Sequence, residues 1–419
     1  MSDKPQVLIL GAGFAGLGAA EKLAKSEADV TLIDMHNYHT FQPMLYQVAT
    51  DLIGTEEVGH PLRDVFRGQP NLRLHTDAVT GIDLANRQVQ FQEIAPINYD
   101  YLVLALGARV NFFGVKGAKE HAFPLYTLPD ALRLKLHILE RWEAADKNPA
   151  IIEDGALDVV VVGGGPTGVE SAGAIIELYR GNFIKDYPHL PAQNARVILV
   201  EFAPKLLGMF KKDIQTYTKN ALEKRGVEVW LGDGVIEVTQ TRVTMKSGKV
   251  INAHTLVWGA GLQGNPLVHA LGIPLQKGER VPVGPDLSIE GHPEVFVVGD
   301  IAWITDTKTN QVLPQLGSVA LQSGELAGEN IAHRISGGET KPFSYFDKGI
   351  MATIGRGAAV MQMPSGKTMK GKMAALAWGT VHLALLTGGD SRTKTMIDWG
   401  WAGFTRKRTE RISVNVSEK

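Results

Sequence analysis

One stretch constrains the fold of this chain more than any other, and it reads VVVVGGGPTGVE at residues 159–170. Four consecutive valines cannot form one face of an amphipathic segment, so they predict a strand that is buried on both sides. The next glycines have the GxGxxG spacing of a dinucleotide-binding turn: Gly163, Gly165 and Gly168. They permit a tight turn, a close approach of backbone to a pyrophosphate, and packing of helix on strand. A helix that begins near Thr167 would point its free N–H groups at the phosphates.

The motif occurs a second time near the amino terminus. Residues 7–18 read VLILGAGFAGLG, and the glycines keep their spacing: Gly11, Gly13 and Gly16. In each copy a later strand ends in an acid, Asp34 or Glu201. An acid at that point accepts hydrogen bonds from a ribose 2′-hydroxyl. The repeat therefore predicts two nucleotide-binding units and two dinucleotides.

Composition narrows the classes of function. A chain of 419 residues is long enough for two or three domains. Its formal net charge of −1 gives no indication of a nucleic-acid partner. The polar amino terminus leads directly into the first predicted strand, and we expect no signal peptide. The absence of cysteine excludes a disulfide framework and any redox-active cysteine.

Further elements are expected outside the two motifs. The pattern predicts a hairpin from Leu72–Val79 and Val89–Phe91, a connecting helix at Thr127–Glu143, and a strand at Val295–Asp300 that ends in Gly-Asp. The segment His39–Asp51 is rich in aromatic and amide side chains. Its simplest interpretation is core packing of a long connection.

The order of these motifs resembles that of flavoprotein reductases that bind two dinucleotides. Three longer stretches resemble, more narrowly, the type II NADH dehydrogenases, which are single-subunit NADH:quinone oxidoreductases. These stretches are FQPMLYQVAT at 41–50, GGGPTGVE at 163–170 and PFSYFDKGIMATIGRGAAV at 342–360. The resemblance covers nearly the whole chain. It implies an α/β fold with two Rossmann-like dinucleotide-binding domains, the second inserted in the first, and a C-terminal membrane-associating segment.

The resemblance also implies domain limits and ligand-binding residues. We expect an FAD-binding domain at 1–118 and 283–345, an NADH-binding domain at 119–282 and a membrane-anchoring segment at 346–419. FAD would be held by the following residues: Gly11, Gly13, Phe14, Ala15, Gly16, Asp34, Thr50, Val79, Gly107, Asp300, Ser318 and Val319. NADH would be held by a second set: Gly163, Gly165, Thr167, Gly168, Glu201 and Gly261. No metal site is expected.

The acid of the second copy also bears on the choice of nucleotide. A carboxylate at Glu201 repels a 2′-phosphate, so we expect NADH to be preferred over NADPH. Lys205 is close in sequence and leaves the strictness of that preference open.

Glu170 is the residue expected to be catalytic. In the family this glutamate lies where nicotinamide and quinone approach the flavin, which implies roles in positioning and in supplying protons, because quinone reduction consumes two protons. The alternative is structural, since a carboxylate in the first turns of a helix stabilises it by about 0.3–1 kcal/mol through the macrodipole. The first copy has Gly18 at this position, so the fold itself does not require an acid.

The expected quinone site departs from the family pattern. The family has Ala-Gln and, after three residues, a second glutamine beside the flavin. Here Ser318 replaces the first glutamine, Gln322 keeps the second, and Gln315 is a candidate to compensate. The alternative for Ser318 is an N-cap of a helix at 319–331.

The C-terminal segment predicts a surface helix pair. Residues 373–389 carry no charge, but about 15 helical residues span roughly 22 Å, too short for a hydrocarbon core of ~30 Å. Tryptophans and the run Arg406-Lys407-Arg408 follow, and residues 366–411 hold nine Lys and Arg against three Asp and Glu. Basic charge beside an apolar run is typical of helices in a membrane interface. The alternative is a docking or homodimer surface.

These expectations combine into one function. The chain would be a peripheral enzyme on the cytoplasmic face of the membrane that passes hydride from NADH to FAD and two electrons to a quinone, without pumping protons. Without cysteine, electrons must leave the flavin directly. One alternative is a soluble NADH-dependent reductase of a ferredoxin or rubredoxin carrier. Another is a redox-sensing scaffold that binds FAD and NADH but turns over poorly.

Overall fold

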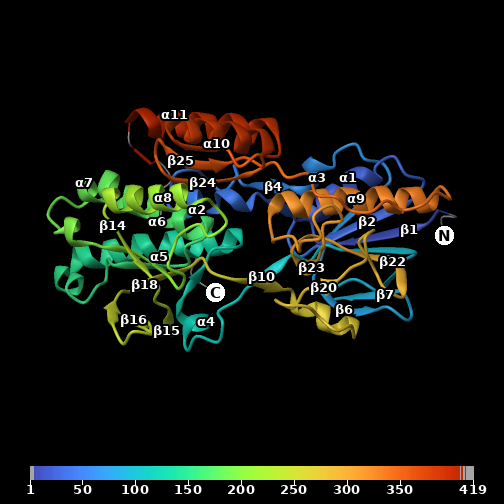
Figure 1. The fold of residues 1–419 in the computed structure, drawn as a ribbon, viewed down its shortest axis with the longest axis horizontal. Helices are drawn as coiled ribbons and strands as arrows, with labels where there is room; N and C mark the ends of the chain where they lie inside the picture. Colours follow the sequence, from blue (N-terminus) through green and yellow to red (C-terminus); the bar gives the residue numbers. More distant parts are fainter. Residues whose placement is uncertain (1–3, 406, 409–410, 412–419) are drawn as a thin grey trace. The chain divides into compact units, whose positions relative to one another are not determined.

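The computed structural model describes residues 4–405, 407, 408 and 411, and its chain divides into two compact units (Figure 1). Unit 1 contains Met1–Thr40, His60–Arg109 and Leu262–Phe346. Unit 2 contains Phe41–Gly59, Val110–Gly261 and Asp347–Lys419. Each unit combines a parallel sheet with helices, so the fold is α/β.

Unit 1 is built on a six-stranded sheet. Its order is β21-β22-β9-β1-β2-β5, with β21 (Ser288–Ile289), β22 (His292–Val297), β9 (Tyr101–Leu104), β1 (Gln6–Leu10), β2 (Asp29–Asp34) and β5 (Leu72–Thr76). All neighbours are parallel except β21 and β22. The five parallel strands follow the 3-2-1-4-5 order of a doubly wound sheet, which places a switch point at the carboxyl end of β1.

Two helices of unit 1 pack on each other through small residues. These helices are α1 (Phe14–Leu23) and α9 (Gly317–Ile335), which lie on one face of the sheet (Figure 1). A Cβ atom on Gly324 would lie 1.9 Å from the carbonyl oxygen of Ala15, and one on Gly18 would lie 2.7 Å from that of Leu321. Larger side chains are therefore excluded where the two backbones meet.

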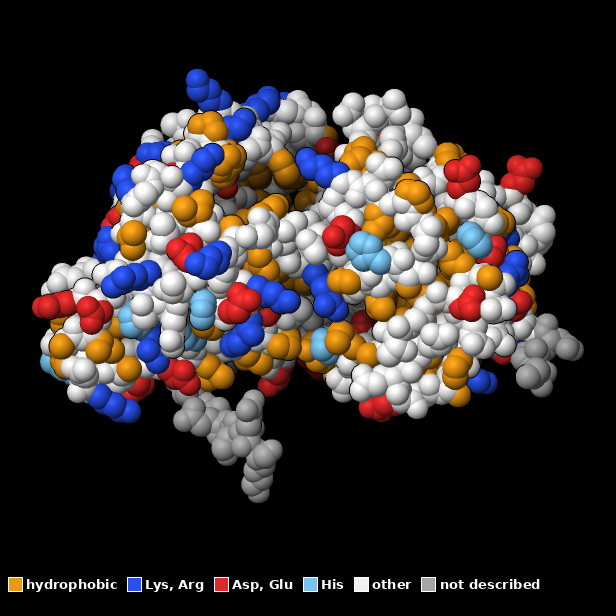
Figure 2. Space-filling model, turned by 90° about the horizontal axis from the view of Figure 1, so that it is seen from below, with side chains coloured by type: hydrophobic (Ala, Val, Ile, Leu, Met, Phe, Trp, Pro, Cys, Tyr) orange, Lys and Arg blue, Asp and Glu red, His pale blue; other side chains and the backbone are white. Residues whose placement is uncertain are grey.

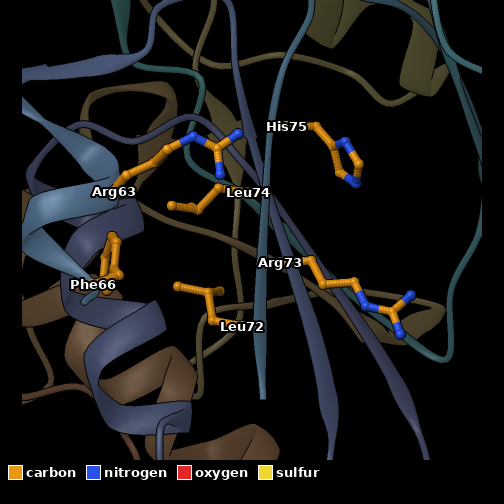
Figure 3. Close-up of a pocket in the computed structure, with 6 residues that line it drawn as sticks. All are labelled: Arg63, Phe66, Leu72, Arg73, Leu74 and His75. Atoms are coloured by element: carbon orange, nitrogen blue, oxygen red, sulfur yellow. The ribbon is translucent and has the colours of Figure 1, made fainter. Parts of the chain in front are cut away.

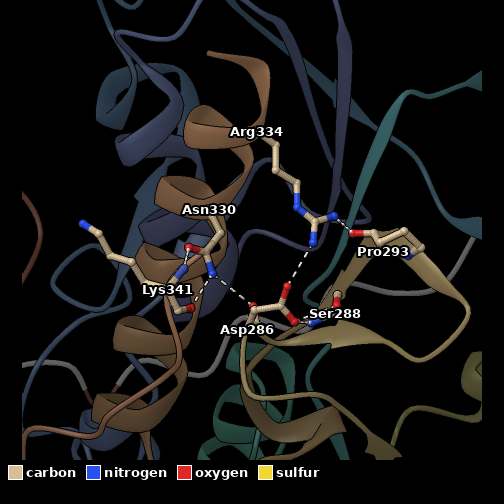
Figure 4. Close-up of polar contacts among 6 residues, drawn as sticks. All are labelled: Asp286, Ser288, Pro293, Asn330, Arg334 and Lys341. Carbon is tan, nitrogen blue, oxygen red and sulfur yellow. Dashed lines mark hydrogen bonds and ion pairs between the residues drawn. The ribbon is translucent and has the colours of Figure 1, made fainter. Parts of the chain in front are cut away.

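A polar cluster fastens α9 to the β21–β22 hairpin (Figure 4). Arg334 donates to Asp286 Oδ2 at 3.0 Å and also to the carbonyl oxygen of Pro293. Asn330 Nδ2 donates to the carbonyl oxygens of Asp286 at 3.1 Å and Lys341 at 2.9 Å. These contacts fix the carboxyl-terminal half of α9 against the edge of the sheet.

The prediction of a hairpin in unit 1 is wrong for one of its two strands. Leu72–Thr76 (β5) joins the main sheet beside β2, and the strands that pair as a hairpin are β6 (Val79–Asp83) and β7 (Gln88–Phe91), with β8 (Ile97–Asn98) added. The break lies at Asp77, whose carboxylate accepts the N–H groups of Ala78 at 2.7 Å and Ile94 at 2.8 Å. One apolar run in the sequence is thus two strands in different sheets.

A hollow of about 410 Å³ lies at the edge strand β5 and the short helix α3 (Leu62–Val65). Its lining residues are Arg63, Phe66, Leu72, Arg73, Leu74 and His75. Figure 3 shows Arg63, Leu72 and Leu74 on one side of the strand, and Arg73 and His75 on the other. This alternation is that of an ordinary edge strand, and none of these residues belongs to a predicted site.

Unit 2 has a five-stranded parallel sheet of order β11-β18-β12-β13-β14. The strands are β11 (Phe123–Pro124), β18 (Thr255–Trp258), β12 (Val159–Val162), β13 (Val197–Glu201) and β14 (Val227–Leu231). The four valines of β12 are buried, as the sequence predicts. The helices around the sheet include α5 (Leu128–Lys147), α6 (Pro166–Leu178) and α8 (Lys212–Arg225). Thr127 begins α5 with a capping box that Asp130 completes.

The C-terminal segment of unit 2 forms a three-stranded antiparallel sheet and two helices. Its elements are β24 (Ile350–Gly355), β25 (Ala358–Gln362), β26 (Thr368–Gly371), α10 (Lys372–Leu385) and α11 (Gly389–Thr405). Figure 1 shows α10 and α11 side by side over β24 and β25. The first helix ends before Gly388, as expected, where φ is +83°. Among the described residues, no helix is both long and apolar enough to cross a membrane.

Shorter elements complete the two units. They are β3 (Tyr38–Thr40), η1 (Gln42–Met44), α2 (Leu45–Ala49), β4 (Gly59–Pro61), β10 (Ala108–Val110), α4 (Ala118–His121), η2 (Pro149–Ile152), η3 (Tyr179–Phe183), α7 (Ile184–Asp186), η4 (Ala192–Asn194), β15 (Val235–Val238), β16 (Arg242–Met245), β17 (Val250–Asn252), β19 (Leu262–Gly264), η5 (Pro266–Leu271), β20 (Val281–Pro282), η6 (Gly299–Ile301) and β23 (Ala302–Trp303).

The compact units differ from the expected domain limits. The expected boundaries at 118/119 and 282/283 correspond to 109/110 and 261/262 in the units. Unit 2 also takes in 41–59 and the C-terminal segment, which were expected outside the second domain. The reason is packing: α2 lies against α5 and α6, and β24 lies against α6.

Candidate nucleotide sites and a buried carboxyl group

The two glycine motifs adopt the same backbone turn. The first glycine of each has a positive φ, +99° at Gly11 and +111° at Gly163, where L residues are strained. A Cβ atom on Gly16 would lie 1.8 Å from the carbonyl oxygen of Gly11, and one on Gly168 would lie 1.8 Å from that of Gly163. Glycine is therefore required at both positions for the turn and the packing of the helix.

The middle glycine of each motif faces open space. A Cβ atom built on Gly13 or Gly165 would meet no atom within 4 Å. These residues are the N-caps of α1 and α6, whose first N–H groups point outward from the helix ends. Both turns are thus cradles that fit an anionic pyrophosphate.

The two acids are held in the same way. Asp34 accepts the N–H of Ala12, in the first glycine turn, at 2.7 Å and that of His36 at 2.7 Å. In the second copy, Glu201 accepts the N–H of Gly164 at 2.5 Å. It also accepts the N–H two residues later, from Ala203, at 2.6 Å. Each carboxylate is therefore fixed beside its glycine turn, at the edge where a ribose would lie.

Other residues expected to bind FAD gather at the same edge of the unit 1 sheet. Gly107 follows β9 with a φ of +66°, and Asp300 follows β22 in η6. Because β1, β2, β9 and β22 are parallel, their carboxyl ends share one edge with Gly11 and Asp34. Phe14 begins α1 and meets His39 edge-on, with ring centroids 5.1 Å apart. Of the expected FAD residues, only Thr50 belongs to unit 2.

Ser318 and Gln322 lie in the first two turns of α9. The N-cap interpretation of Ser318 is wrong, because the helix begins at Gly317 after the cap Leu316. The Ser318 hydroxyl lies 2.8 Å from Tyr345 Oη. Gln322 accepts the N–H of Phe346 at 2.9 Å and donates to its carbonyl oxygen at 3.1 Å. Both side chains therefore hold the segment at 345–346.

Gln315 does not take the place of the missing glutamine by contact with Ser318. Its Nε2 donates instead to the carbonyl oxygen of Asp300 at 2.9 Å. Gln315 lies just before the start of α9. Its hydrogen bond therefore ties that part of the chain to the loop that carries Asp300.

The second copy has one exposed aromatic residue that the sequence analysis did not predict as part of the site. Phe202 follows Glu201 directly, and the residue is 69% exposed. Lys246 Nζ lies 5.7 Å from the centroid of the Phe202 ring. The signal that could have found it is its place after the ribose acid, where an exposed aromatic ring offers a flat stacking surface.

Gly261 forms the far end of the expected NADH site in unit 2. It has a φ of +70°, and its carbonyl oxygen accepts the N–H of Asn111 at 3.1 Å. A Cβ atom there would lie 2.3 Å from the ring of Phe113, which is 63% exposed. The positive φ and the close approach of Phe113 therefore both favour glycine at position 261.

Glu170 is a buried carboxyl group on α6. Its side chain accepts the N–H of Thr353 at 3.0 Å, and the residue is only 8% exposed. Burial raises the pKa of Glu170 to about 8, although the Thr353 N–H lowers it. Burial therefore favours the neutral, protonated form of this carboxyl group. A neutral carboxyl beyond the first turn gains little from the helix dipole, which speaks against the structural alternative.

The helix after the glycine turn packs differently in the two copies. This difference explains why only the second copy has an acid at position 170. In unit 1 a Cβ on Gly18 would collide with the backbone of α9, 2.7 Å from Leu321 O. In unit 2 the same helix face meets β24 instead. There the close contact is shifted to Gly173, whose Cβ would lie 2.1 Å from Ile354 O. A side chain at 170 therefore has room beside Thr353.

The segment expected as core packing is confirmed as buried. Tyr46 and Gln47 on α2 are 6% and 2% exposed, and Thr50 is 1% exposed. Tyr46 Oη lies 3.0 Å from Thr353 Oγ1, and Thr50 Oγ1 donates to the carbonyl oxygen of Tyr46 at 2.8 Å. Burial raises the pKa of Tyr46 well above its usual value, so the phenol stays protonated.

Two buried charges adjoin this segment. Asp51 has a φ of +59° and pairs with Lys135 at 2.9 Å. Burial raises the pKa of Asp51 to about 6, although the Lys135 ammonium opposes it. Arg408 was expected in a basic surface run, but it is 8% exposed and donates to the carbonyl oxygens of Thr50 and Ala174. Arg406, which belongs to the same basic run, lies outside the described residues.

Comparison with known proteins places this geometry in a family. Residues 5–324 match the model for pyridine nucleotide-disulphide oxidoreductases. The chain is 36% identical to the type II NADH:quinone oxidoreductase Ndh of Mycobacterium tuberculosis, over 94% of this chain and 87% of the relative. It is 31% identical to the type II NADH:quinone oxidoreductase of Staphylococcus haemolyticus, over 89% of this chain and 93% of the relative.

Solved structures agree on the fold. The structure of NDH2 from Plasmodium falciparum in complex with NADH matches with a TM-score of 0.89 at 21% identity, covering 98% of this chain and 100% of that one. A sulfide:quinone oxidoreductase from Aquifex aeolicus matches with a TM-score of 0.71 at 19% identity, covering 96% of each chain. The absence of cysteine separates this chain from relatives that use a redox disulfide. It belongs to the family of type II NADH:quinone oxidoreductases.

Proposed function

We propose that this protein oxidises NADH and reduces a quinone, with FAD as the resident cofactor. The observation that carries the proposal is a pair of matching nucleotide cradles, each with its fixed acid, in a chain that has no cysteine. Electrons from the nicotinamide can therefore leave only through the flavin itself. The curated relatives are named for the same reaction.

The residues of unit 1 fit FAD. The open space before Gly13 receives the pyrophosphate, Asp34 binds the adenosine ribose, and Asp300 binds the ribityl chain. The other residues of unit 1 that we assign to this site are Gly11, Phe14, Ala15, Gly16, Val79, Gly107, Ser318 and Val319. Thr50, which belongs to unit 2, stays a prediction. When bound, FAD supplies the hydride and electron-transfer chemistry, and the protein supplies orientation. The N–H groups at the start of α9 stabilise negative charge near Ser318.

Unit 2 binds NADH at its own glycine turn. The N-terminus of α6 at Gly165 and Thr167 binds the pyrophosphate, Glu201 binds the ribose 2′-hydroxyl, and Gly261 lies at the nicotinamide end. Phe202 offers its exposed ring to the adenine base. A second negative charge on the 2′-oxygen would be repelled by Glu201, so NADPH binds less well.

Glu170 acts as the proton donor for quinone reduction. Its carboxyl is neutral at pH 7 because burial raises its pKa to about 8. A buried carboxylate left after donation is unstable, and this favours its reprotonation before the next turnover. Ser318 and Gln322 contribute to the quinone site through the segment that they hold at 345–346.

The helix pair α10 and α11 docks on an anionic membrane surface. Its exposed apolar side chains include Met373, Leu376, Ile397, Trp401 and Phe404, which are 52–92% exposed. Exposed basic residues flank them: Lys367, Lys370, Lys372, Arg392, Lys394 and Lys407. Apolar insertion together with attraction to anionic lipid is how interfacial helices bind. The enzyme is then peripheral, and we infer that it lies on the cytoplasmic face of the membrane.

A different face of the molecule carries charges of both signs. Figure 2 shows basic and acidic side chains interspersed over the surface that is seen from below in Figure 1. Within unit 2, β15 and β16 lie on that side, away from α10 and α11 (Figure 1). A surface of mixed charge has no preference for anionic lipid.

A steady-state assay with purified holoenzyme tests the function. NADH oxidation is measured with a lipid-tailed quinone, a water-soluble quinone, a ferredoxin and oxygen as acceptors. We expect both quinones to be reduced fastest. Faster transfer to the ferredoxin would support the carrier-reductase alternative, and slow turnover with every acceptor would support the redox-sensing scaffold.

A further inference from the structure

A line of hydrogen bonds runs within unit 2 from helix α11 to the carboxyl group of Glu170. Trp399 Nε1 donates to Gln47 Oε1 at 2.7 Å, and Gln47 Nε2 donates to Tyr46 Oη at 2.9 Å. Tyr46 Oη lies 3.0 Å from Thr353 Oγ1. The backbone N–H of Thr353 then donates to Glu170 Oε1 at 3.0 Å.

The donor-only indole sets the direction of this line. Because Trp399 Nε1 can only donate, the oxygen of the Gln47 amide must face it. The amide nitrogen is thereby turned toward Tyr46 and donates to its hydroxyl oxygen. The hydroxyl group of Tyr46, which is 6% exposed, then has its hydrogen available to donate to Thr353 Oγ1. Every donor in the line therefore points toward Glu170.

The line ends on the strand that packs against the helix of Glu170. Thr353 is in β24, and the next residue, Ile354, approaches α6 so closely that only Gly173 fits opposite its carbonyl oxygen. A small displacement of β24 therefore changes the N–H that reaches Glu170. Loss of one donor in a buried line leaves an acceptor unpaired, which destabilises the arrangement of the others.

We propose that Trp399 is a positioning residue for Glu170, acting through Gln47, Tyr46 and Thr353. The helix pair α10–α11 then belongs to the machinery of quinone reduction in addition to its docking surface. This inference rests on the proposed role of Glu170 as a proton donor.

The substitution Trp399→Phe tests the proposal because it removes the N–H and keeps an aromatic ring beside Trp378, whose centroid lies 5.7 Å away. We expect the quinone-dependent half-reaction to slow about 3- to 10-fold, the effect of one lost hydrogen bond, while reduction by NADH is unchanged. The matched control is Trp230→Phe on β14 of the same unit, which should leave both half-reactions at the wild-type rate.

Infrared spectroscopy of the holoenzyme gives a readout that does not depend on quinone. The C=O stretching band of protonated Glu170, identified by its loss in Glu170→Gln, should move to higher frequency in Trp399→Phe. The reason is that Glu170 Oε1 loses a well-placed N–H donor. An unmoved band would overturn the proposal. A moved band with unchanged quinone kinetics would keep the positioning role and refute the proton role of Glu170 instead.

A double-mutant cycle tests the route. Tyr46→Phe interrupts the line in the middle, so adding Trp399→Phe to it should shift the Glu170 band no further. If the two shifts add, Trp399 does not act through Tyr46 and the proposed route is wrong.

Discussion

Replacing Glu170 by glutamine should separate the two halves of the reaction. Glutamine has nearly the same shape and keeps an oxygen that can accept the Thr353 N–H, so the fold around it is preserved. With a pKa of about 8, most of the native carboxyl groups carry a proton at pH 7. The amide cannot give up a proton. The quinone-dependent step should therefore slow by about 10²- to 10⁴-fold, the usual effect of losing a positioned acid.

Stopped-flow mixing measures the two steps separately. NADH first bleaches the flavin absorbance, and a quinone then restores it. Bleaching should be nearly unchanged, because hydride transfer needs alignment, which the isosteric amide retains. In the wild type, the return of absorbance should slow about tenfold per pH unit above pH 8, as the acid form of Glu170 is lost. The variant should show no such pH dependence.

Two results would refute this reasoning. If bleaching slows as much as the return of absorbance, Glu170 positions the nicotinamide and does not supply protons. If neither step slows, the carboxyl has only a structural role.

The same variant should be more stable than the wild type at high pH. The pKa of Glu170 is about 8 in the folded protein and near the ordinary value of 4.5 when unfolded, so the unfolded state loses its proton first. Wild-type stability therefore falls as pH rises from about 4.5 to 8, by roughly 3–5 kcal/mol. Thermal unfolding of both proteins between pH 5 and 9 should show a widening gap in Tm. A constant gap would mean that the carboxyl is not strongly perturbed.

Three further predictions concern other parts of the chain. Glu201→Gln should reduce the ratio of kcat/KM for NADH over NADPH at least about tenfold, or roughly 1.4 kcal/mol, because repulsion of a 2′-phosphate is removed. Leu376→Asp with Ile397→Asp should weaken sedimentation with anionic liposomes at least about tenfold, since each apolar side chain contributes about 1.5–3 kcal/mol when buried. Lys135→Met should lower the free energy of unfolding by about 3–5 kcal/mol, and more at pH 8 than at pH 5, because Asp51 is left unpaired and charged.

Each of these has a matched control. Glu223→Gln, at an exposed position on α8, should leave nucleotide preference unchanged. Ile236→Asp, which is 50% exposed on β15, should not alter liposome binding. Lys219→Met removes an exposed pair with Glu223 and should change stability by less than about 1 kcal/mol. A control that behaves like its test variant would show that the effect is not specific to the predicted site.

The sequence by itself determined the two nucleotide cradles. Glycine at Gly11 and Gly163 is demanded by a positive φ, and glycine at Gly16 and Gly168 by contacts within the same turn. These constraints are local, so a spacing of a few residues is enough to reveal them. The acids that end the second strand of each copy are Asp34 and Glu201. They too are predicted from a local pattern, because each directly ends an apolar run.

Only the tertiary structure decided which neighbours the other residues have. The run after Leu72 divides between two sheets, because Asp77 binds N–H groups from a distant loop. The Ser318 hydroxyl contacts Tyr345. Arg408 was expected on the surface, but it is buried and donates to the carbonyl oxygen of Thr50. These partners are far apart in the sequence, and no periodic pattern records them.

The buried carboxyl shows the same division most clearly. The sequence placed Glu170 near the start of a helix and left its role balanced between the dipole and catalysis. What decides its chemistry is β24, which covers α6 in unit 2 where α9 covers α1 in unit 1. Burial by that strand raises the pKa of Glu170, and burial is a property of packing between segments, which local sequence does not encode.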